Sequence, residues 1–251
     1  MSTEKDSAPS LGALPPRFPS GPHHRGPSLF AVAVVHAALF VGSLALGTAL
    51  AGGEHIPSPL GPASLSKAYF SQHSSAVAVS ACMQFGAAIP IGIYTATVTS
   101  RLRFLGVQVA GASIALFGGV MASAMLAASA LFLSTLSHPS VAENEGVAHA
   151  LHWLAFGFGG PGYVVCYGLL VAGVAVTGGL HRFLPRWLMW WGIALAVIAE
   201  LSTLSLVIPS FAYLLPIARF PGFGWLVVTA LRMPKTRTRA SAPNVAAVQG
   251  V

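Results

Sequence analysis

Charged residues are scarce in this sequence. Asp, Glu, Lys and Arg make up only 8% of the 251 residues, whereas they make up about 25% of a soluble domain. The hydrophobic share is 55%, and the apolar residues come in long uninterrupted runs. A helix that crosses a bilayer needs about 20 such residues in a row. The composition therefore excludes an ordinary soluble domain and predicts a membrane protein.

Side chains for familiar enzyme chemistry are also scarce. The one aspartate, Asp6, lies in a Pro- and Ser-rich stretch, and there is no GxSxG, GxxxxGK[ST] or HExxH motif. Cys82 and Cys166 fall inside apolar runs and form no CxxC pair, so we interpret them as small buried hydrophobes. An enzyme is the weaker class, and we expect no catalytic residue, no resident metal and no cofactor.

Histidines keep one metal hypothesis open. Glu145, His149 and His152 recur at spacings of four and three residues, which places them on one face of a helix. Imidazole and carboxylate groups are ligands for zinc and related ions. A metal-dependent membrane enzyme is therefore a third hypothesis. The preferred interpretation is that these histidines lie at a membrane interface.

Six apolar runs follow one another along the chain. Lipid offers no partner to a free backbone N–H or C=O group, so each run is predicted to be a helix. The first run is longer than the 7–15 apolar residues of a secretory signal. The fold class is therefore all-α: a polytopic six-helix transmembrane bundle at residues 29–231, between disordered polar tails at 1–28 and 232–251. The runs cover residues 29–51, 75–99, 107–133, 147–177, 186–207 and 211–231.

The distribution of charge supports this helix count. If the N-terminus is in the cytoplasm, all Lys and Arg residues except Lys67 and Arg219 fall in cytoplasmic segments, as the positive-inside rule requires. The basic residues beside helix ends also account for the net charge of +7, so we expect no nucleic acid partner. The expected location is a bacterial cytoplasmic (inner) membrane with both termini cytoplasmic. The lipid bilayer is the expected partner, and a protein partner or homo-oligomer is left open.

The last two runs form a predicted hairpin around Pro209 and Ser210. Glu200 lies nine residues before Pro209, and Arg219 lies nine residues after Ser210. At 1.5 Å per residue, both charges are about 14 Å from the turn, near the middle of the bilayer. We therefore predict an intramembrane ion pair. It is either a structural clamp, which is favoured, or part of a transport route; a third alternative is that Arg219 reaches the membrane surface without Glu200.

The fourth run is interrupted at its centre by Gly159, Gly160, Pro161 and Gly162. Interrupted helices often line transport sites, so these residues are candidates for the lining of a cavity. The alternative, which is favoured, is close packing with a kink.

A ridge of small residues follows the third run at every fourth position. Small residues on one helix face let a neighbouring backbone approach closely in a membrane. We therefore predict that this helix is central to the packing of the bundle. The ridge consists of Gly111, Ala115, Gly119, Ser123 and Ala127.

Four stretches carry a family resemblance. They are FGAAIPIGIYTATVTSRLR at 85–103, FGFGGPGYVVCYGLLVAG at 156–173, LPRWLMWWGIALAV at 184–197 and YLLPIARFPGFGWLVVTALRMP at 213–234. In these stretches the chain resembles the DUF4386-type bacterial multi-pass membrane proteins, over roughly residues 30–234. The resemblance implies a six-helix integral membrane protein. It implies no catalytic residue, because that family has no established biochemical activity.

These observations lead to three hypotheses about function. The first is a non-enzymatic integral membrane protein of unknown molecular role. The second is a small-solute or proton-coupled carrier that uses Glu200 and Arg219. The third is the metal-dependent membrane enzyme.

Overall fold

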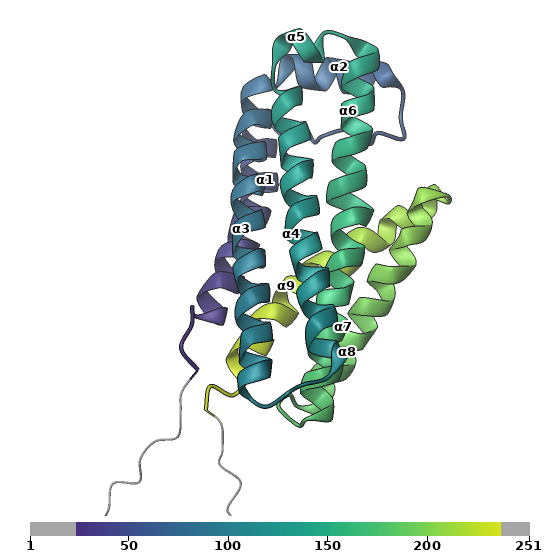
Figure 1. Ribbon diagram of the computed structural model, residues 1–251. Coiled ribbons are helices and arrows are strands. Elements are labelled where there is room, and N and C mark those ends of the chain that lie inside the picture. The colour runs from purple at the N-terminus through teal and green to yellow at the C-terminus, as the bar shows by residue number, and fades with distance from the viewer. Residues whose placement is uncertain (1–23, 237–251) are drawn as a thin grey trace, which may run out of the picture.

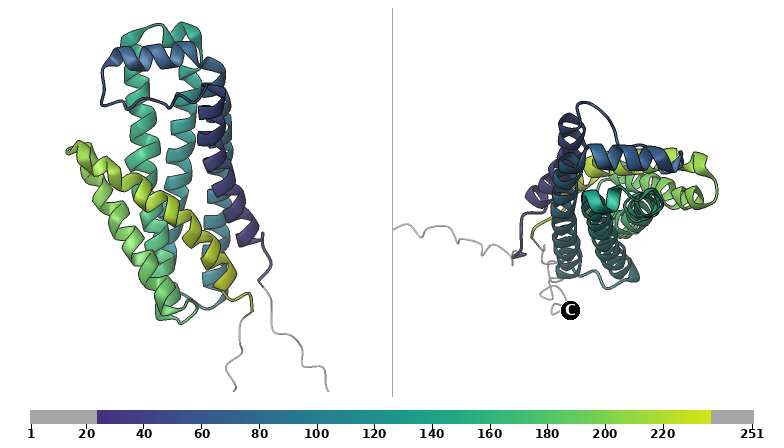
Figure 2. Two further views of the ribbon diagram at one scale, coloured as in Figure 1. Left: turned by 180° about the vertical axis from the view of Figure 1, so that it is seen from behind. Right: turned by 90° about the horizontal axis from the view of Figure 1, so that it is seen from above.

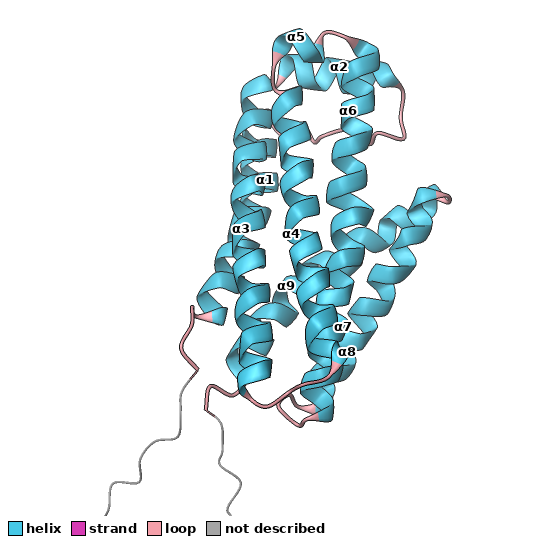
Figure 3. Cartoon of the chain, in the orientation of Figure 1, coloured by secondary structure: helices cyan, strands magenta, loops and turns pink. Residues whose placement is uncertain are grey.

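The computed structural model of the protein describes residues 24–236. In this part of the chain all regular secondary structure is helical (Figure 3). Six helices are long and apolar enough to cross a membrane, which confirms the predicted all-α six-helix bundle. Most of the predicted tails at 1–28 and 232–251 lies outside the described residues. The six spans are Leu29–Leu50, Ser74–Phe104, Ala110–Leu136, Glu145–Leu180, Arg186–Leu206 and Pro209–Arg232.

Some of these spans consist of more than one helical element. The fourth span contains a π-helical turn, η1, and the fifth and sixth spans meet through two 3₁₀ turns, η2 and η3. The elements in chain order are α1 (Leu29–Leu50), α2 (Ala63–Gln72), α3 (Ser74–Phe104), α4 (Ala110–Leu136), α5 (Pro139–Ala142), α6 (Glu145–Gly157), η1 (Phe158–Gly162), α7 (Tyr163–Leu180), α8 (Arg186–Leu201), η2 (Ser202–Leu206), η3 (Pro209–Tyr213) and α9 (Leu214–Arg232).

Local sequence explains several helix ends. Ser28 caps α1 by accepting a hydrogen bond from the backbone N–H of Ala31, and Asn144 caps α6 by accepting one from Val147. The turn between α3 and α4 contains Gly106 at φ 96°, a left-handed conformation that glycine adopts without strain. The short helices α2 and α5 lie between the predicted apolar runs, and the sequence analysis predicted no helix there.

The two ends of the described chain lie at the same end of the bundle (Figure 1). The backbone N–H of His24 donates to the carbonyl of Lys235 at 3.1 Å. We call this the terminal end. Helices α2 and α5 cover the opposite end, which we call the capped end (Figure 1).

Helix α4 packs between α3 and α7, and glycines make this contact close. A Cβ atom on Gly118 would lie 2.6 Å from the Cβ of Leu169, and one on Gly173 would lie 2.6 Å from the carbonyl oxygen of Gly111. A Cβ atom on Gly119 would collide with the side chain of Thr95. The predicted ridge on this helix is therefore a packing surface, and the predicted central role of the helix is confirmed.

Helix α9 does not run parallel to the other spans. It crosses the bundle obliquely from the tip of the α8–α9 hairpin to the terminal end (Figure 2). The indole Nε1 of Trp225 on α9 donates to the carbonyl of Leu188 on α8 at 2.9 Å. The hydroxyl of Tyr94 on α3 donates to the carbonyl of Leu226 on α9 at 3.3 Å. These bonds connect α9 to both sides of the bundle near the terminal end.

Candidate functional site

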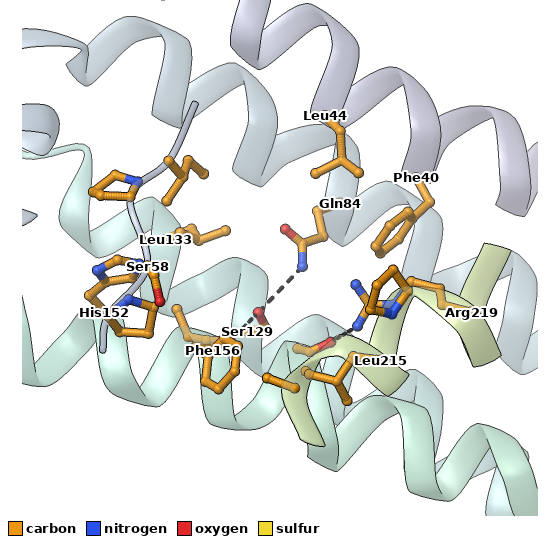
Figure 4. Close-up of a pocket in the computed structure, with 18 residues that line it drawn as sticks. Phe40, Leu44, Ser58, Gln84, Ser129, Leu133, His152, Phe156, Leu215 and Arg219 are labelled. Atoms are coloured by element: carbon orange, nitrogen blue, oxygen red, sulfur yellow. Dashed lines mark hydrogen bonds between the residues drawn. The ribbon is translucent and has the colours of Figure 1, made fainter. Parts of the chain in front are cut away.

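A cavity of about 420 Å³ lies between the oblique helix α9 and the capped end of the bundle. We call it the cleft. Helices α1, α3, α4, α6 and α9, the turns η1 and η3 and the segment 56–59 supply its walls. Most of its lining is apolar, and a few polar side chains interrupt it (Figure 4). The side chains that Figure 4 labels are Phe40, Leu44, Ser58, Gln84, Ser129, Leu133, His152, Phe156, Leu215 and Arg219.

Arg219 projects from α9 into the cleft (Figure 4). Its Nη2 donates a hydrogen bond to the carbonyl of Gly159. Its guanidinium carbon lies 4.9 Å from the ring centroid of Phe40 and 5.2 Å from that of Tyr163. An arginine in the middle of a membrane helix costs about 2.5–3.5 kcal/mol on insertion scales. The two aromatic faces and the carbonyl offset part of that cost.

The guanidinium keeps hydrogen-bonding capacity for a further partner. An arginine has five N–H donors, and the Nε of Arg219 is buried without any hydrogen-bond partner. Among residues 24–236 the one ion pair within 4.0 Å joins His73 and Glu54, so no carboxylate neutralises Arg219 there. The cleft thus combines an apolar wall with an uncompensated positive charge.

The acceptor for Arg219 belongs to the glycine-rich interruption of the fourth span. Residues Phe158–Gly162 form a π-helical turn, and Pro161 within it has no backbone N–H to donate. The wider turn leaves carbonyl oxygens available to donors on other helices. Of the four candidates for cavity lining, Gly159 and Gly160 line the cleft, whereas Pro161 and Gly162 are not part of its lining. Gly162 instead packs towards Met125.

A polar pair lies midway along the cleft. The amide nitrogen of Gln84 on α3 donates to the hydroxyl of Ser129 on α4 at 3.3 Å (Figure 4). Ser129 in turn donates to the carbonyl of Ala155 on α6 at 2.8 Å. Because its nitrogen makes the contact with Ser129, Gln84 has an amide oxygen left to accept a hydrogen bond. The cleft therefore offers an acceptor at Gln84 in addition to the donors of Arg219.

A hydrogen-bonded chain connects the cleft to the capped end. The indole Nε1 of Trp153 donates to Nε2 of His149 at 3.1 Å, so Nδ1 of a neutral His149 carries the proton and donates to Ser66 at 3.3 Å. The Ser66 hydroxyl can then donate to Nδ1 of His152 at 2.9 Å. This chain connects α2 to α6. In the part of the chain that the structure describes, no group of three His, Cys, Asp or Glu side chains could hold a metal ion.

A buried pair supports the aromatic side of the Arg219 site. Nδ1 of His36 lies 2.8 Å from the carbonyl of Ala87, which only accepts, so this nitrogen carries the proton. Nε2 then accepts from the hydroxyl of Tyr163 at 3.1 Å. His36 and Tyr163 are both fully buried. These bonds fix the orientation of the Tyr163 ring beneath the guanidinium.

The predicted ion pair between Glu200 and Arg219 is wrong. Glu200 is exposed on α8, and its carboxylate lies near the backbone of Gly168 on α7. Arg219 contacts Gly159, on a different part of the bundle. Equal distances from the hairpin turn match the depth of two residues but do not fix the direction of their side chains. The 3₁₀ turns η2 and η3 and the oblique path of α9 give the two side chains different directions.

Phe40, Gln84 and Ser129 line the cleft but were not predicted from the sequence. A signal for Gln84 was present, because it is the one amide side chain within the predicted span 75–99. A polar residue inside an apolar run is a candidate functional residue in a membrane protein. Phe40 and Ser129 have no such signal, because phenylalanine and serine are common in membrane helices.

Comparison of this chain with protein families, with curated proteins and with solved structures found no match. The resemblance to the DUF4386-type proteins therefore stays a prediction. The geometry of the cleft is the observation that bears on function.

Proposed function

We propose that this chain is a non-enzymatic integral membrane protein that binds a small anion with an apolar body in the cleft. The observation that supports this proposal is the uncompensated guanidinium of Arg219 on an otherwise mainly apolar wall. A buried charge is stable when it is paired, and no carboxylate in the described residues pairs with this one. A ligand that brings a negative charge and an apolar surface would complement both features.

The decisive experiment compares an acid with an alcohol of the same chain length. Radiolabelled decanoate is the probe, and its binding to purified, immobilised protein in a non-ionic detergent is measured by scintillation proximity. Arg219→Met should weaken binding roughly tenfold to a hundredfold, because hydrogen bonds to charged groups contribute about 1.5–3 kcal/mol. Arg219→Lys should keep part of the affinity, because it keeps the charge.

Two controls make this experiment specific. Arg186→Met removes an exposed arginine outside the cleft and should leave decanoate binding unchanged. Decanol has the same chain without the charge and should compete poorly. Equal competition by decanol and decanoate, or unchanged binding in Arg219→Met, would contradict the proposal. Strong binding of acetate would instead indicate a hydrophilic anion.

A carrier for such anions is the second candidate function. It is favoured by the extent of the cleft, which reaches from the segment 56–59 to Arg219 near the middle of the last span. Decanesulfonate is a suitable probe, because its permanent charge slows its passage across pure lipid. Uptake into proteoliposomes that depends on Arg219 would support transport. Binding without uptake would leave a binding protein.

We further propose that the protein lies in a bacterial cytoplasmic membrane with its terminal end in the cytoplasm. Support comes from the basic residues near the terminal end and from Glu54, Glu143 and Glu145 in the segments at the capped end.

Cysteine labelling tests this orientation. After replacement of Cys82 and Cys166, a single cysteine introduced at Ser137 should react with an impermeant maleimide in intact cells. One introduced at His181 should react only after the cells are permeabilised. The reverse pattern would contradict the orientation.

A further inference from the structure

A second cavity adjoins the cleft towards the capped end. Its volume is about 240 Å³, and α1, α2, α3 and the segment after α1 supply its walls. We call it the side cavity. Leu44 and Ile56 line both the side cavity and the cleft, so these two side chains lie between the two spaces.

The side cavity presents a mainly apolar surface, to which Thr48, His55, Tyr69 and Ser80 add polar groups. Ala76 and Val77 on α3 belong to its wall and are buried. Ser80 also lines it, but its hydroxyl donates to the carbonyl of Ser43 at 2.8 Å and is therefore satisfied. Burial, together with the charge of Glu54, raises the pKa of Tyr69, so its phenol stays neutral near pH 7. A hydrocarbon chain suits this space better than a second charged group.

We propose that the ligand of the cleft is the carboxylate of a single long alkyl chain, and that Ile56 sets the length of chain that the site accepts. This inference rests on the proposed binding of an anion by Arg219. With the carboxylate at Arg219, the apolar wall of the cleft continues through Leu44 to Ile56. Beyond Ile56 the side cavity can hold further methylenes. Leu44 and Ile56 are the two side chains that line both spaces, so a single alkyl chain that passes them would occupy the cleft and the side cavity.

The test is the dependence of affinity on chain length. Equilibrium binding of decanoate and of palmitate is measured for the full-length protein and for Ile56→Ala. Truncation of Ile56 should open the side cavity, so the ratio of palmitate affinity to decanoate affinity should rise about tenfold, since each further buried methylene strengthens binding about fourfold. Ile56→Val removes one methyl group and should give a smaller rise, which provides a second measurement if Ile56→Ala folds poorly.

Two further variants control for indirect effects. Val77→Phe in the Ile56→Ala background refills the side cavity and should restore the wild-type ratio. Ile89→Ala truncates an isoleucine on α3 that is 53% exposed and lines neither cavity, so the ratio should not change.

The possible results distinguish a failure of this inference from a failure of the proposed anion site. If wild-type protein binds decanoate through Arg219 but Ile56→Ala and Ile56→Val leave the ratio unchanged, the anion site stands and the role of Ile56 is overturned. If dimyristoylphosphatidylglycerol displaces decanoate as well as palmitate does, the ligand is a two-chain lipid and the single-chain inference is overturned. If Arg219→Met binds both acids normally, the proposed function itself fails.

Discussion

The contact of α4 with α3 and α7 and the contact of η1 with α4 and α9 are both built on glycines, but only the glycines of the second line the cleft. In the first, Gly118 and Gly173 bring backbone and Cβ atoms so close that an added Cβ would lie 2.6 Å from a neighbour. In the second, Gly159 and Gly160 line the cleft beside Arg219.

The difference lies in the backbone hydrogen bonds. A glycine inside a regular α-helix leaves the N–H and C=O groups paired along the helix, so its flat surface can press against another helix. The π-helical turn with Pro161 leaves a carbonyl that Arg219 uses. That turn therefore attracts a charged side chain, and a charged side chain prevents tight apolar packing. Small residues thus allow tight packing of α4 against α3 and α7, whereas in η1 they line a cavity that contains a charged side chain.

The largest expected effect on stability is at the contact of α4 with α3. Gly119→Leu adds a side chain where even a Cβ atom would collide with Thr95, so α3 and α4 must separate. Overpacking of a close-packed interior costs about 1–3 kcal/mol and sometimes more, and we expect about 3 kcal/mol or more here because backbone must move. Thermal unfolding in detergent is the measurement.

A neighbouring position provides the control for this variant. Val120→Leu introduces the same side chain on the same helix, at a residue that is 51% exposed, and should leave the unfolding temperature nearly unchanged. Similar unfolding temperatures for Gly119→Leu and Val120→Leu would show that the contact between α3 and α4 is loose.

An intermediate effect is expected at the wall of the cleft. Gly159→Ala places a methyl group against the hydroxyl of Ser129, and we expect a loss of about 2 kcal/mol in the free energy of unfolding. Gly157→Ala is the matched control, because an added Cβ there meets no atom within 4 Å. It should stabilise the protein by about 0.5–1 kcal/mol, since alanine is favoured over glycine in a helix.

If the free energy of unfolding falls in Gly159→Ala and rises in Gly157→Ala, the wall of the cleft is tightly packed where Gly159 meets Ser129. Removal of the Ser129 hydroxyl side chain by Ser129→Gly should relieve part of the cost of Gly159→Ala. If Gly159→Ala is as benign as Gly157→Ala, Gly159 does not pack tightly against Ser129.

The smallest expected effect concerns Glu200. Because Glu200 is exposed and does not contact Arg219, Glu200→Gln should change stability by less than about 0.5 kcal/mol, in the wild type and in Arg219→Met alike. A double-mutant cycle on thermal unfolding measures the coupling. A coupling energy of several kcal/mol, with stability recovered in the double variant, would show that Glu200 and Arg219 form the predicted ion pair. The positive charge in the cleft would then be compensated, and the proposed anion site would lose its support.

Much of the fold was predictable because the bilayer imposes simple rules. The six predicted runs match the six spans to within a few residues at most ends, since the number of apolar residues and the flanking charges depend on local composition. The polar helix α2 was missed because its ten residues carry no long apolar run. The ridge through Gly119 was found because a spacing of four residues follows directly from helix geometry.

The sequence by itself determined the number of spans, their approximate ends, the packing role of the small residues in α4 and the presence of Arg219 within an apolar span. Only the tertiary structure decided that Arg219 lies against Gly159, Phe40 and Tyr163 and not against Glu200, and that Gln84 and Ser129 share its cleft. The physical reason is that span number depends on the transfer of each segment into lipid, whereas the partner of a side chain depends on the rotation and crossing angle of whole helices. Helix rotation and crossing angle are set by packing between segments far apart in the chain. They cannot be obtained by counting residues from a turn.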